Sequence, residues 1–209
     1  MPSLQKLLGK DDQFFDLLEA SAEQARHSVQ ALRTFLGNPG EQRTLDDLIA
    51  SRRRDKAITT QIGDALCTDL ITALEPHDVE VLSTSLYKIP KTIEKVAERI
   101  LLAPQHLQGI DLTPQVLMIE QATDVLLQMV RELRKGMPRS RATTLNAQLQ
   151  SVEGAADKTV LELLRTLYNT QADPGRLLFL KDVYELLERV TDRCRDAGNV
   201  ISHIVLKSV

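Results

Sequence analysis

The chain has 209 residues, 43% of them hydrophobic and 26% charged, which suffices for a buried core and excludes an intrinsically disordered chain. Only 3% are aromatic and none is Trp, which argues against a base-stacking platform. With 26 Lys and Arg against 29 Asp and Glu, the net charge is −3, so we expect no nucleic-acid partner.

Proline and glycine residues mark where helices are expected to begin and end. Proline suits the first turn of a helix, because its missing N–H has no intrahelical partner there, and glycine suits the position just after a helix. The marking residues in chain order are Gly37, Pro39, Pro76, Pro114, Gly136 and Pro174. Three of these prolines follow a short polar residue that is an expected N-cap, namely Asn38, Thr113 and Asp173.

These signals predict six helices, and no alternating β-branched run bounded by turns predicts a strand. The predicted helices lie at residues 12–36, 39–74, 77–102, 114–135, 139–169 and 174–206. The third contains Pro90, which removes one backbone donor and predicts a kink. No apolar run reaches the roughly 20 residues of a membrane-spanning helix, so we predict an all-α fold without membrane insertion.

The third and sixth helices repeat one apolar pattern at a fixed distance. The third has apolar residues three or four positions apart, at Val79, Leu82, Leu86, Ile89, Ile93, Val96 and Ile100. The sixth has apolar residues 101 positions after each of these, at Leu180, Val183, Leu187, Val190, Cys194, Ala197 and Ile201. This spacing is the seam of an antiparallel bundle. We therefore predict one domain, residues 1–209, built of two pseudo-symmetric three-helix bundles: repeat one at 12–103, a linker at 104–113 and repeat two at 114–207.

Carboxylates four residues apart recur on the last two predicted helices. The fifth helix has Glu153 and Asp157, and the sixth has Glu188, Asp192 and Asp196. Residues at this spacing share a helix face, where like charges repel, so converging acids predict a site for a divalent metal or iron. The alternative is a solvated face that its arginines partly neutralise, namely Arg189, Arg193 and Arg195. The residues alone leave both interpretations open.

The first half differs at the corresponding positions. With the shift of 101, Glu188, Asp192 and Asp196 correspond to Tyr87, Lys91 and Lys95. With a shift of 102 on the second helix, Glu153 and Asp157 correspond to Ser51 and Asp55. Further cations flank these positions, namely Arg52, Arg53, Arg54, Lys56 and Lys88. The first half is therefore expected to hold no cation, and its basic face suits an anion, an acidic partner or internal ion pairs.

At these residues the sequence resembles the PhoU-like phosphate-transport regulators, in particular the accessory proteins of Pit-type phosphate transporters. The resemblance covers nearly the whole chain and rests on the two three-helix repeats and three segments. The segments are FFDLLEASAEQA at 14–25, ERVTDRCRDAGNVI at 188–201, and the opening of the third helix with Pro76 and Asp78.

The resemblance implies an all-α cytoplasmic protein. Its implied partner is either the cytoplasmic face of a membrane phosphate transporter, which would place it peripherally at the inner membrane, or a phosphate-signalling protein. Some members of the family bind multinuclear metal clusters through Glu/Asp-x-x-x-Asp motifs. Those motifs match Glu153, Asp157, Glu188 and Asp192, with Asp196 as a further position. In the first half only Asp55 matches, so a second cluster is not expected.

An enzymatic alternative rests on His77 and Asp78, which match the paired residues of metal-dependent HD phosphohydrolases. That chemistry needs an earlier His and a later Asp, and no spacing singles out the candidates His27 and Asp124. Asp78 is explained by its place in a first helical turn, where a carboxylate interacts favourably with the helix dipole. No nucleotide-binding or hydrolase motif occurs, so we predict that the protein is not an enzyme.

The preferred hypothesis is a non-enzymatic regulator or adaptor of phosphate transport that docks a helical surface on a transporter or signalling partner. The rival hypothesis is a structural helical module that self-associates as a homo-oligomer through an apolar stripe. Leu178 and Leu186 lie off the seam, where they either supply that stripe or widen the core-facing side of the helix. Cys67 and Cys194 lack CxxC spacing and are interpreted as reduced packing residues. The first ten residues show no signal-peptide pattern, which favours a cytoplasmic protein.

Overall fold

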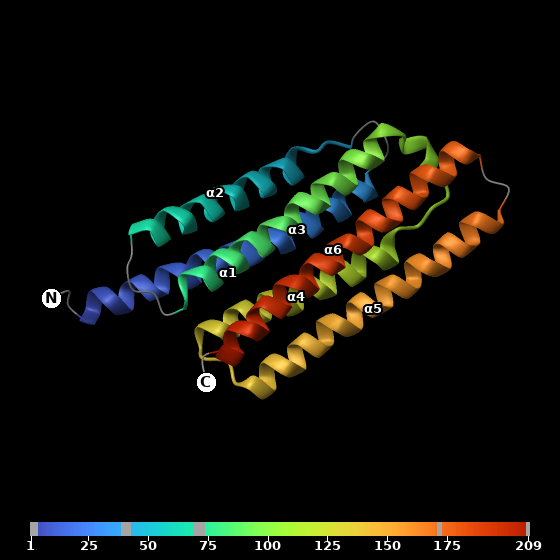
Figure 1. Ribbon diagram of the computed structural model, residues 1–209. Coiled ribbons are helices and arrows are strands. Elements are labelled where there is room, and N and C mark those ends of the chain that lie inside the picture. Colours follow the sequence, from blue (N-terminus) through green and yellow to red (C-terminus); the bar gives the residue numbers. More distant parts are fainter. Residues whose placement is uncertain (1–3, 39–42, 69–73, 171–172, 208–209) are drawn as a thin grey trace.

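The structure is a computed structural model, and it describes residues 4–38, 43–68, 74–170 and 173–207 (Figure 1). Its helices are α1 (Leu4–Gly37), α2 (Asp46–Thr68), α3 (Pro76–Leu102), α4 (Thr113–Arg134), α5 (Arg139–Asn169) and α6 (Pro174–Lys207), with a short 3-10 helix, η2, at Pro104–Leu107. No strand occurs in these described ranges, so the predicted all-α class with six helices is confirmed.

The second helix begins later than predicted. It begins at Asp46, and residues 43–45 before it are not helical. The Arg43 guanidinium donates to the carbonyl oxygens of Asn38 (3.1 Å) and Leu36 (3.4 Å), which ties this segment back to the end of α1. Asp46 and Asp47 then provide the negative charge that favours a helix start. Asn38, the expected N-cap of this helix, lies before its first residue. Pro39, the expected first residue, lies outside the described residues.

The other helix ends follow the sequence signals in part. Pro76 opens α3 as predicted, and the Asp173 carboxylate accepts a hydrogen bond from the Arg176 N–H (3.0 Å), as an N-cap does. The cap at Thr113 is wrong: α4 already includes Thr113, whose N–H donates to the Asp111 carboxylate (2.9 Å). Gly136 has the positive φ of 71° expected after a helix.

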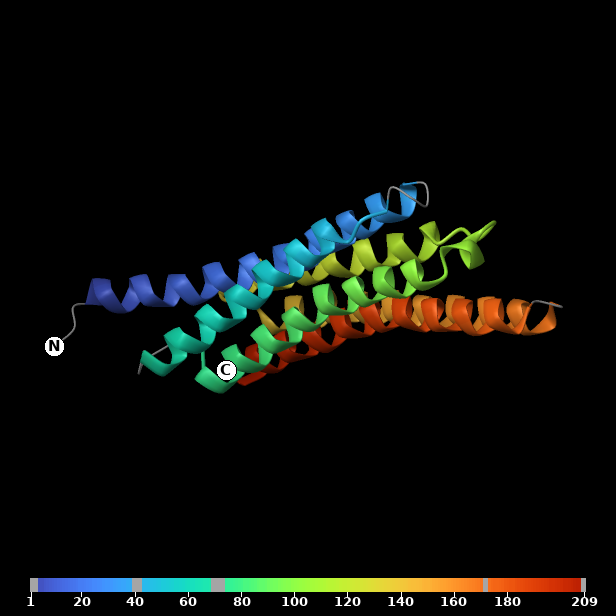
Figure 2. The same ribbon diagram turned by 90° about the horizontal axis from the view of Figure 1, so that it is seen from above.

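The six helices form two layers (Figures 1 and 2). In one layer α3 and α6 lie side by side and antiparallel, and in the other α1 packs against α4. α2 covers the outer edge of the first half and α5 covers that of the second. An approximate two-fold axis, perpendicular to the layers and passing between α3 and α6, therefore relates the halves.

The predicted seams of α3 and α6 form the core. Every seam residue is at most 1% exposed. α3 continues through Pro90 to Leu102. Cys67 and Cys194 are free thiols as predicted, but Cys67 is exposed, so its expected role in packing is wrong. Burial in the seam raises the pKa of Cys194, which makes that thiol inert. Within the described chain, no helix is long and apolar enough to cross a bilayer.

A single shift of 101 relates the buried positions of all three helix pairs. In α1, the buried residues Phe14, Leu18, Ala22 and Val29 match the buried residues Gln115, Ile119, Thr123 and Val130 of α4. In α2, the buried residues Leu48, Ser51 and Asp55 match the buried residues Leu149, Val152 and Ala156 of α5. The shift of 102 expected for the second helix is therefore wrong, because it pairs the fully buried Asp55 with the exposed Asp157.

Candidate functional site

The close packing of α5 on α6 brings the five predicted acids to one surface. Gly198 of α6 permits this approach, because a Cβ there would clash with the Leu149 side chain of α5. Glu153 and Asp157 lie one turn apart on α5, and the three acids of α6 occupy three successive turns. We call the set Glu153, Asp157, Glu188, Asp192 and Asp196 the acidic patch.

The Arg195 guanidinium lies among three of these acids. It forms an ion pair with Glu153 of α5, with Asp192 at 3.1 Å and with Asp196 at 3.1 Å. Burial lowers the pKa of Arg195, but these carboxylates together raise it above its ordinary value. Arg193 adds a second ion pair to Asp196, at 3.3 Å. Two of the three neutralising arginines that the sequence suggested, Arg193 and Arg195, thus pair with acids of the patch, whereas Arg189 forms no ion pair with a described residue.

Glu188 is the least favourable carboxylate to ionise in this patch. Its partial burial, followed by the negative charges and hydrogen bonds of Asp192 and Asp157, raises its pKa to about 7. The structure therefore brings Glu188 against both of these acids. The Glu188 carboxyl therefore keeps its proton to a higher pH than an ordinary glutamate does.

In this arrangement the Arg195 guanidinium competes with any metal ion for the acids of the patch. Among the described residues, no three His, Cys, Asp or Glu side chains are placed to hold a metal ion as they stand. Arg195 supplies the positive charge, and its ion pairs engage Glu153, Asp192 and Asp196. A metal ion would have to displace this guanidinium, so metal binding at the acidic patch stays a prediction.

The corresponding surface of the first half has the opposite charge. With the shift of 101, the acids of the patch correspond to Arg52, Lys56, Tyr87, Lys91 and Lys95. Arg195 itself corresponds to Glu94. The ion pair between Arg52 and Glu94 thus occupies the place of the ion pair between Glu153 and Arg195, with the charges exchanged between the helices. The opposite charge of the two halves therefore extends to more positions than the sequence comparison indicated, because Arg52 and Lys56 also correspond to acids.

In the ion pair between Arg52 and Glu94, the acidic side chain is the more buried of the two. The Glu94 side chain is 8% exposed, and hydrogen bonds from Arg52 to Glu94 and Tyr87 raise the pKa of Arg52. Lys91 lies over the Tyr87 ring, 5.9 Å from its centre. Lys56, Lys91 and Lys95 are exposed and form no ion pair with any residue the structure describes. We call Arg52, Lys56, Lys88, Lys91 and Lys95 the basic patch.

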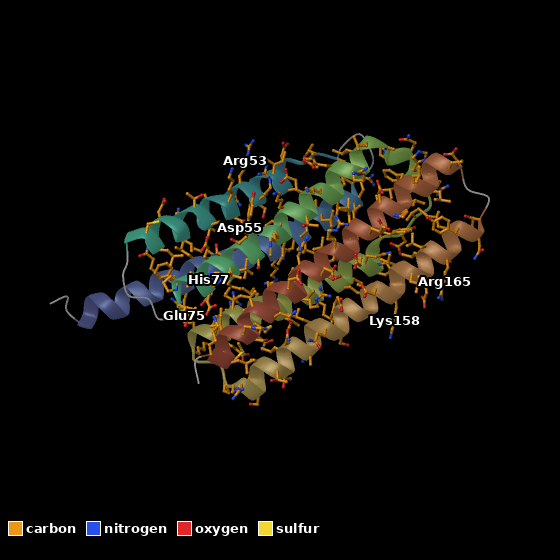
Figure 3. The ribbon with its side chains drawn as sticks, viewed as in Figure 1. Arg53, Asp55, Glu75, His77, Lys158 and Arg165 are labelled. Carbon is orange, nitrogen blue, oxygen red and sulfur yellow. The ribbon has the colours of Figure 1, made fainter. Side chains whose placement is uncertain are left out.

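Asp55 belongs to neither patch. It lies on the inner side of α2, whereas Arg53 lies on the outer side (Figure 3), and it is fully buried. Burial raises the pKa of Asp55 to about 7, and the neighbouring Ser21 hydroxyl acts weakly in the other direction. Both carboxyl oxygens lack a hydrogen bond of normal geometry within the described structure. The alignment of Asp55 with a metal-ligand motif is therefore wrong.

The residues of the enzymatic alternative have structural roles. The Lys207 ammonium group pairs with Asp78 (2.8 Å) and Glu75 (3.3 Å), which fastens the end of α6 to the start of α3. His77 is exposed beside them (Figure 3). Asp124 of α4 pairs with Arg26 of α1 at 2.8 Å. Asp78 and Asp124 are therefore both held in ion pairs between helices.

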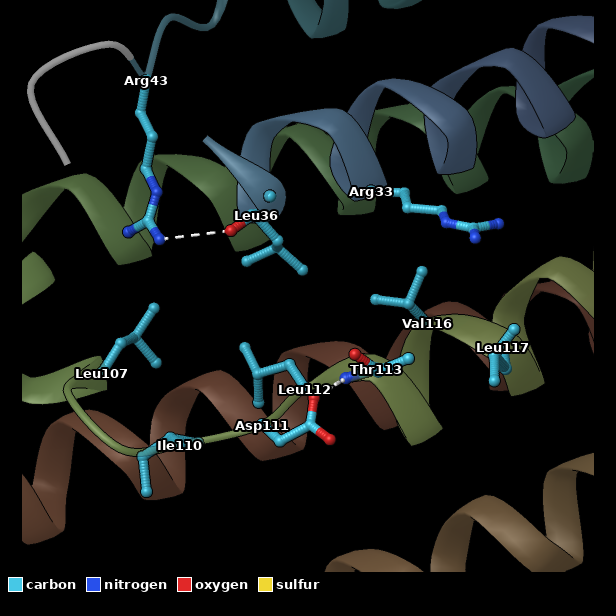
Figure 4. A pocket seen from close by; sticks show the side chains of 11 residues that line it. Arg33, Leu36, Arg43, Leu107, Ile110, Asp111, Leu112, Thr113, Val116 and Leu117 are labelled. Atoms are coloured by element: carbon cyan, nitrogen blue, oxygen red, sulfur yellow. Dashed lines mark hydrogen bonds between the residues drawn. The ribbon is translucent and has the colours of Figure 1, made fainter. Parts of the chain in front are cut away.

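A separate pocket lies where α1, the linker and α4 meet (Figure 4). Its volume is about 390 Å³ and its apolar wall includes Leu107, Leu112 and Val116. The two arginines at its rim are already engaged: Arg43 donates to backbone carbonyls of α1, and Arg33 pairs with Glu120 at 3.3 Å. The pocket contains none of the patch residues, so the patches remain the candidate site.

Comparison with known proteins supports this assignment of fold. No family model matches the chain. A protein of Rhizobium meliloti (strain 1021) named "Putative pit accessory protein" is 24% identical over 209 residues, which cover 98% of both chains. The crystal structure of a PhoU-like protein from Shewanella oneidensis MR-1 superposes with a TM-score of 0.72 at 18% identity, over 95% of this chain and 99% of that one.

A second structure from Shewanella oneidensis MR-1, described as a "putative PhoU-like phosphate regulatory protein", also has a TM-score of 0.72. Its sequence is 19% identical, and the match covers 96% of this chain and 100% of the other. The fold is therefore PhoU-like, and the resemblance seen in the sequence is confirmed.

Proposed function

We propose that this protein is a non-enzymatic regulator or adaptor of phosphate transport that docks a helical surface on a membrane phosphate transporter or a phosphate-signalling partner. The observation that supports this most is the similarity to the Rhizobium protein named as a pit accessory protein, because it spans 98% of both chains. The PhoU-like fold over 95% of the chain agrees with it. Both halves of the molecule are therefore included in the comparison.

The acidic patch is the surface that best suits a transporter. Cytoplasmic loops of membrane proteins carry an excess of Lys and Arg, so they present positive charge to a docking protein. Asp157 of the patch forms no ion pair with a described residue of this chain, so its negative charge is available to a partner. We therefore place the docking contact on α5 and α6.

A metal ion at the patch would change this contact. Iron, manganese or zinc bound through Glu153, Asp157, Glu188 and Asp192 would take over the charge of Arg195 and reduce the negative potential that attracts basic loops. Because Glu188 holds its proton up to about pH 7, acid conditions oppose metal binding. Metal would thus tune the affinity for the partner.

We expect weak binding of Mn²⁺ to the wild-type protein and loss of that binding in the double variant Glu188→Ala, Asp192→Ala. Arg195→Met should instead strengthen binding by about tenfold, because it removes the competing cation. Isothermal titration at neutral pH measures both effects. Glu80→Ala, Glu98→Ala, which removes two exposed acids of α3, is the control. Equal binding in the wild type and the patch variant would rule out this metal site.

Transport is the decisive test of the proposed function. In cells that lack this gene but keep the phosphate transporter, we expect the rate of phosphate uptake to change and the wild-type gene to restore it. Glu188→Gln, Asp192→Asn should fail to restore the rate, whereas the control Glu80→Gln, Glu162→Gln, at exposed acids of α3 and α5, restores it. An unchanged uptake rate after gene deletion would contradict the regulatory role. Full restoration by the patch variant would contradict only the docking surface.

A further inference from the structure

The two patches lie on the same broad side of the molecule. α3 and α6 form one layer, with α2 and α5 at its outer edges (Figures 1 and 2). The basic patch extends over α2 and α3, and the acidic patch over α5 and α6. The approximate two-fold axis between α3 and α6 exchanges the two patches. We call this side the α3/α6 face.

Each patch retains charge that its own chain does not neutralise. Lys56, Lys88, Lys91 and Lys95 are exposed, and none forms an ion pair within the described chain. On the acidic side, Arg195 and Arg193 engage part of the patch, but Asp157 and Glu188 have no cationic partner among the described residues. The α2 and α3 half of the face therefore carries an excess of positive charge and the α5 and α6 half an excess of negative charge, with the exposed Glu98 and Arg189 as exceptions.

We propose that this face joins two copies of the chain in a face-to-face dimer, in which the basic patch of each copy contacts the acidic patch of the other. The contact is isologous, because it occurs twice around one two-fold axis. Both patches are built on the same helix-pair geometry, so opposite charges recur with equal spacing at Lys91 and Asp192, and at Lys56 and Asp157. That match of pattern favours a second copy as the partner.

The face also has apolar surface at one end. Leu102, at the end of α3, is 74% exposed, and Leu178, near the start of α6, is 62% exposed. The ion pair between Arg99 and Asp182 (2.8 Å) shows that these helix ends lie together. A dimer axis parallel to α3 and α6 brings Leu102 of one copy to Leu178 of the other. Burial of these side chains adds hydrophobic stabilisation to the charge pairing.

The neighbouring groove fits this arrangement. It has a volume of about 460 Å³ and is lined by Lys95, Glu98, Arg99, Leu102, Leu186 and Arg189. Leu186 had been singled out as an off-seam residue for self-association, and here it lies on the proposed interface. The groove therefore combines two leucines with charged side chains, the mixture found across the core and rim of an interface.

An anionic membrane fits this face less well. Lys and Arg near an anionic bilayer gain roughly 1 kcal/mol each. The acidic patch lies in the same plane, so a flat membrane that attracts α2 and α3 would repel α5 and α6. A second copy satisfies both halves at once, because turning it over places acids opposite cations on both sides.

Two charge-reversal variants and their mixture test the dimer. Lys56→Glu, Lys91→Glu places acids opposite the partner's Asp157 and Asp192, and Asp157→Lys, Asp192→Lys places cations opposite the partner's Lys56 and Lys91. In sedimentation velocity with EDTA, which excludes metal bridging, we expect wild-type dimers that dissociate about tenfold more readily in high salt. Each variant alone should be monomeric. An equimolar mixture should restore the dimer, because each interface then again pairs opposite charges.

Matched controls separate this result from a general effect of charge. Lys158→Glu, Arg165→Glu makes the same change on the outer side of α5 (Figure 3), and we expect it to dimerise like the wild type. Circular dichroism checks that each variant is folded. If a reversal prevents folding, Lys91→Gln and Asp192→Asn remove the charge alone, and each should weaken the dimer.

Three results would overturn the proposal. They are a monomeric wild type at about 100 μM in low salt, a mixture of variants that stays monomeric, and reversal variants that dimerise as the wild type does. Binding to phosphatidylglycerol vesicles that depends on Lys56 and Lys91, without dimers, would assign the face to a membrane instead. In the dimer the acidic patch is covered, so a transporter loop would bind there only in competition with the second copy. The measurements use purified protein alone, so their failure leaves the transport proposal standing.

Discussion

At about pH 8, Asp55→Asn is expected to raise the free energy of unfolding by on the order of 2–4 kcal/mol. The buried Asp55 carboxyl has a pKa of about 7 in the folded protein, against about 3.9 in an unfolded chain. Between these values the folded state binds a proton that the unfolded state has released. The contribution of Asp55 therefore falls by about 1.4 kcal/mol per pH unit as the pH rises from about 4 to 7.

Urea unfolding at a series of pH values measures this effect. The variant should lack most of the fall in stability that the wild type shows between acid and neutral pH. Glu188, whose pKa also lies near 7, contributes the part that remains. Glu80→Gln changes an exposed acid of α3 and should leave the wild-type profile unchanged. If Asp55→Asn has the same pH dependence as the wild type, Asp55 is not buried in the folded protein.

Arg52→Met is expected to destabilise the protein by about 2–3 kcal/mol. The substitution keeps most of the side-chain volume but leaves the Glu94 carboxylate, which is 8% exposed, without its cation. An unpaired charge at such a site loses its solvation without compensation. The partly exposed position of Arg52 places the effect at the lower end of the range for buried pairs.

The second half of the molecule suggests the control for this variant. Arg52→Glu, Glu94→Arg gives α2 and α3 the charge order that Glu153 and Arg195 have on α5 and α6. We expect the exchanged pair to recover most of the lost stability in urea unfolding. A cost as large as that of Arg52→Met would show that the two positions are not equivalent. The structural correspondence between the two halves would then not hold at this ion pair.

The helices and the seam were accessible to sequence analysis because burial on a helix has a local period. Apolar residues three or four positions apart identify one face of a helix without knowledge of its partner. The seams of α3 and α6 are buried as this period predicts. The start of α2 was not accessible, because the contacts of Arg43 with the end of α1 hold residues 43–45 out of the helix.

The candidate site was predictable in composition but not in pairing. The acids at Glu153, Glu188 and Asp192 were identified from their spacing, and the structure brings them to one surface around Arg195. Nothing in the spacing indicates that Arg195 rather than Arg189 reaches across to α5. That choice depends on which side of α6 faces α5, and only the packed pair of helices shows it.

By itself, the sequence determined the all-α class, the repeated seam and the opposite charges of the two halves. Tertiary structure alone decided that Arg52 is the counterpart of Glu153, and that Asp55 is a core residue rather than a ligand. The physical reason is that one residue along a helix turns a side chain by about 100°. An alignment that is wrong by one position therefore matches a surface carboxylate to a residue of the core.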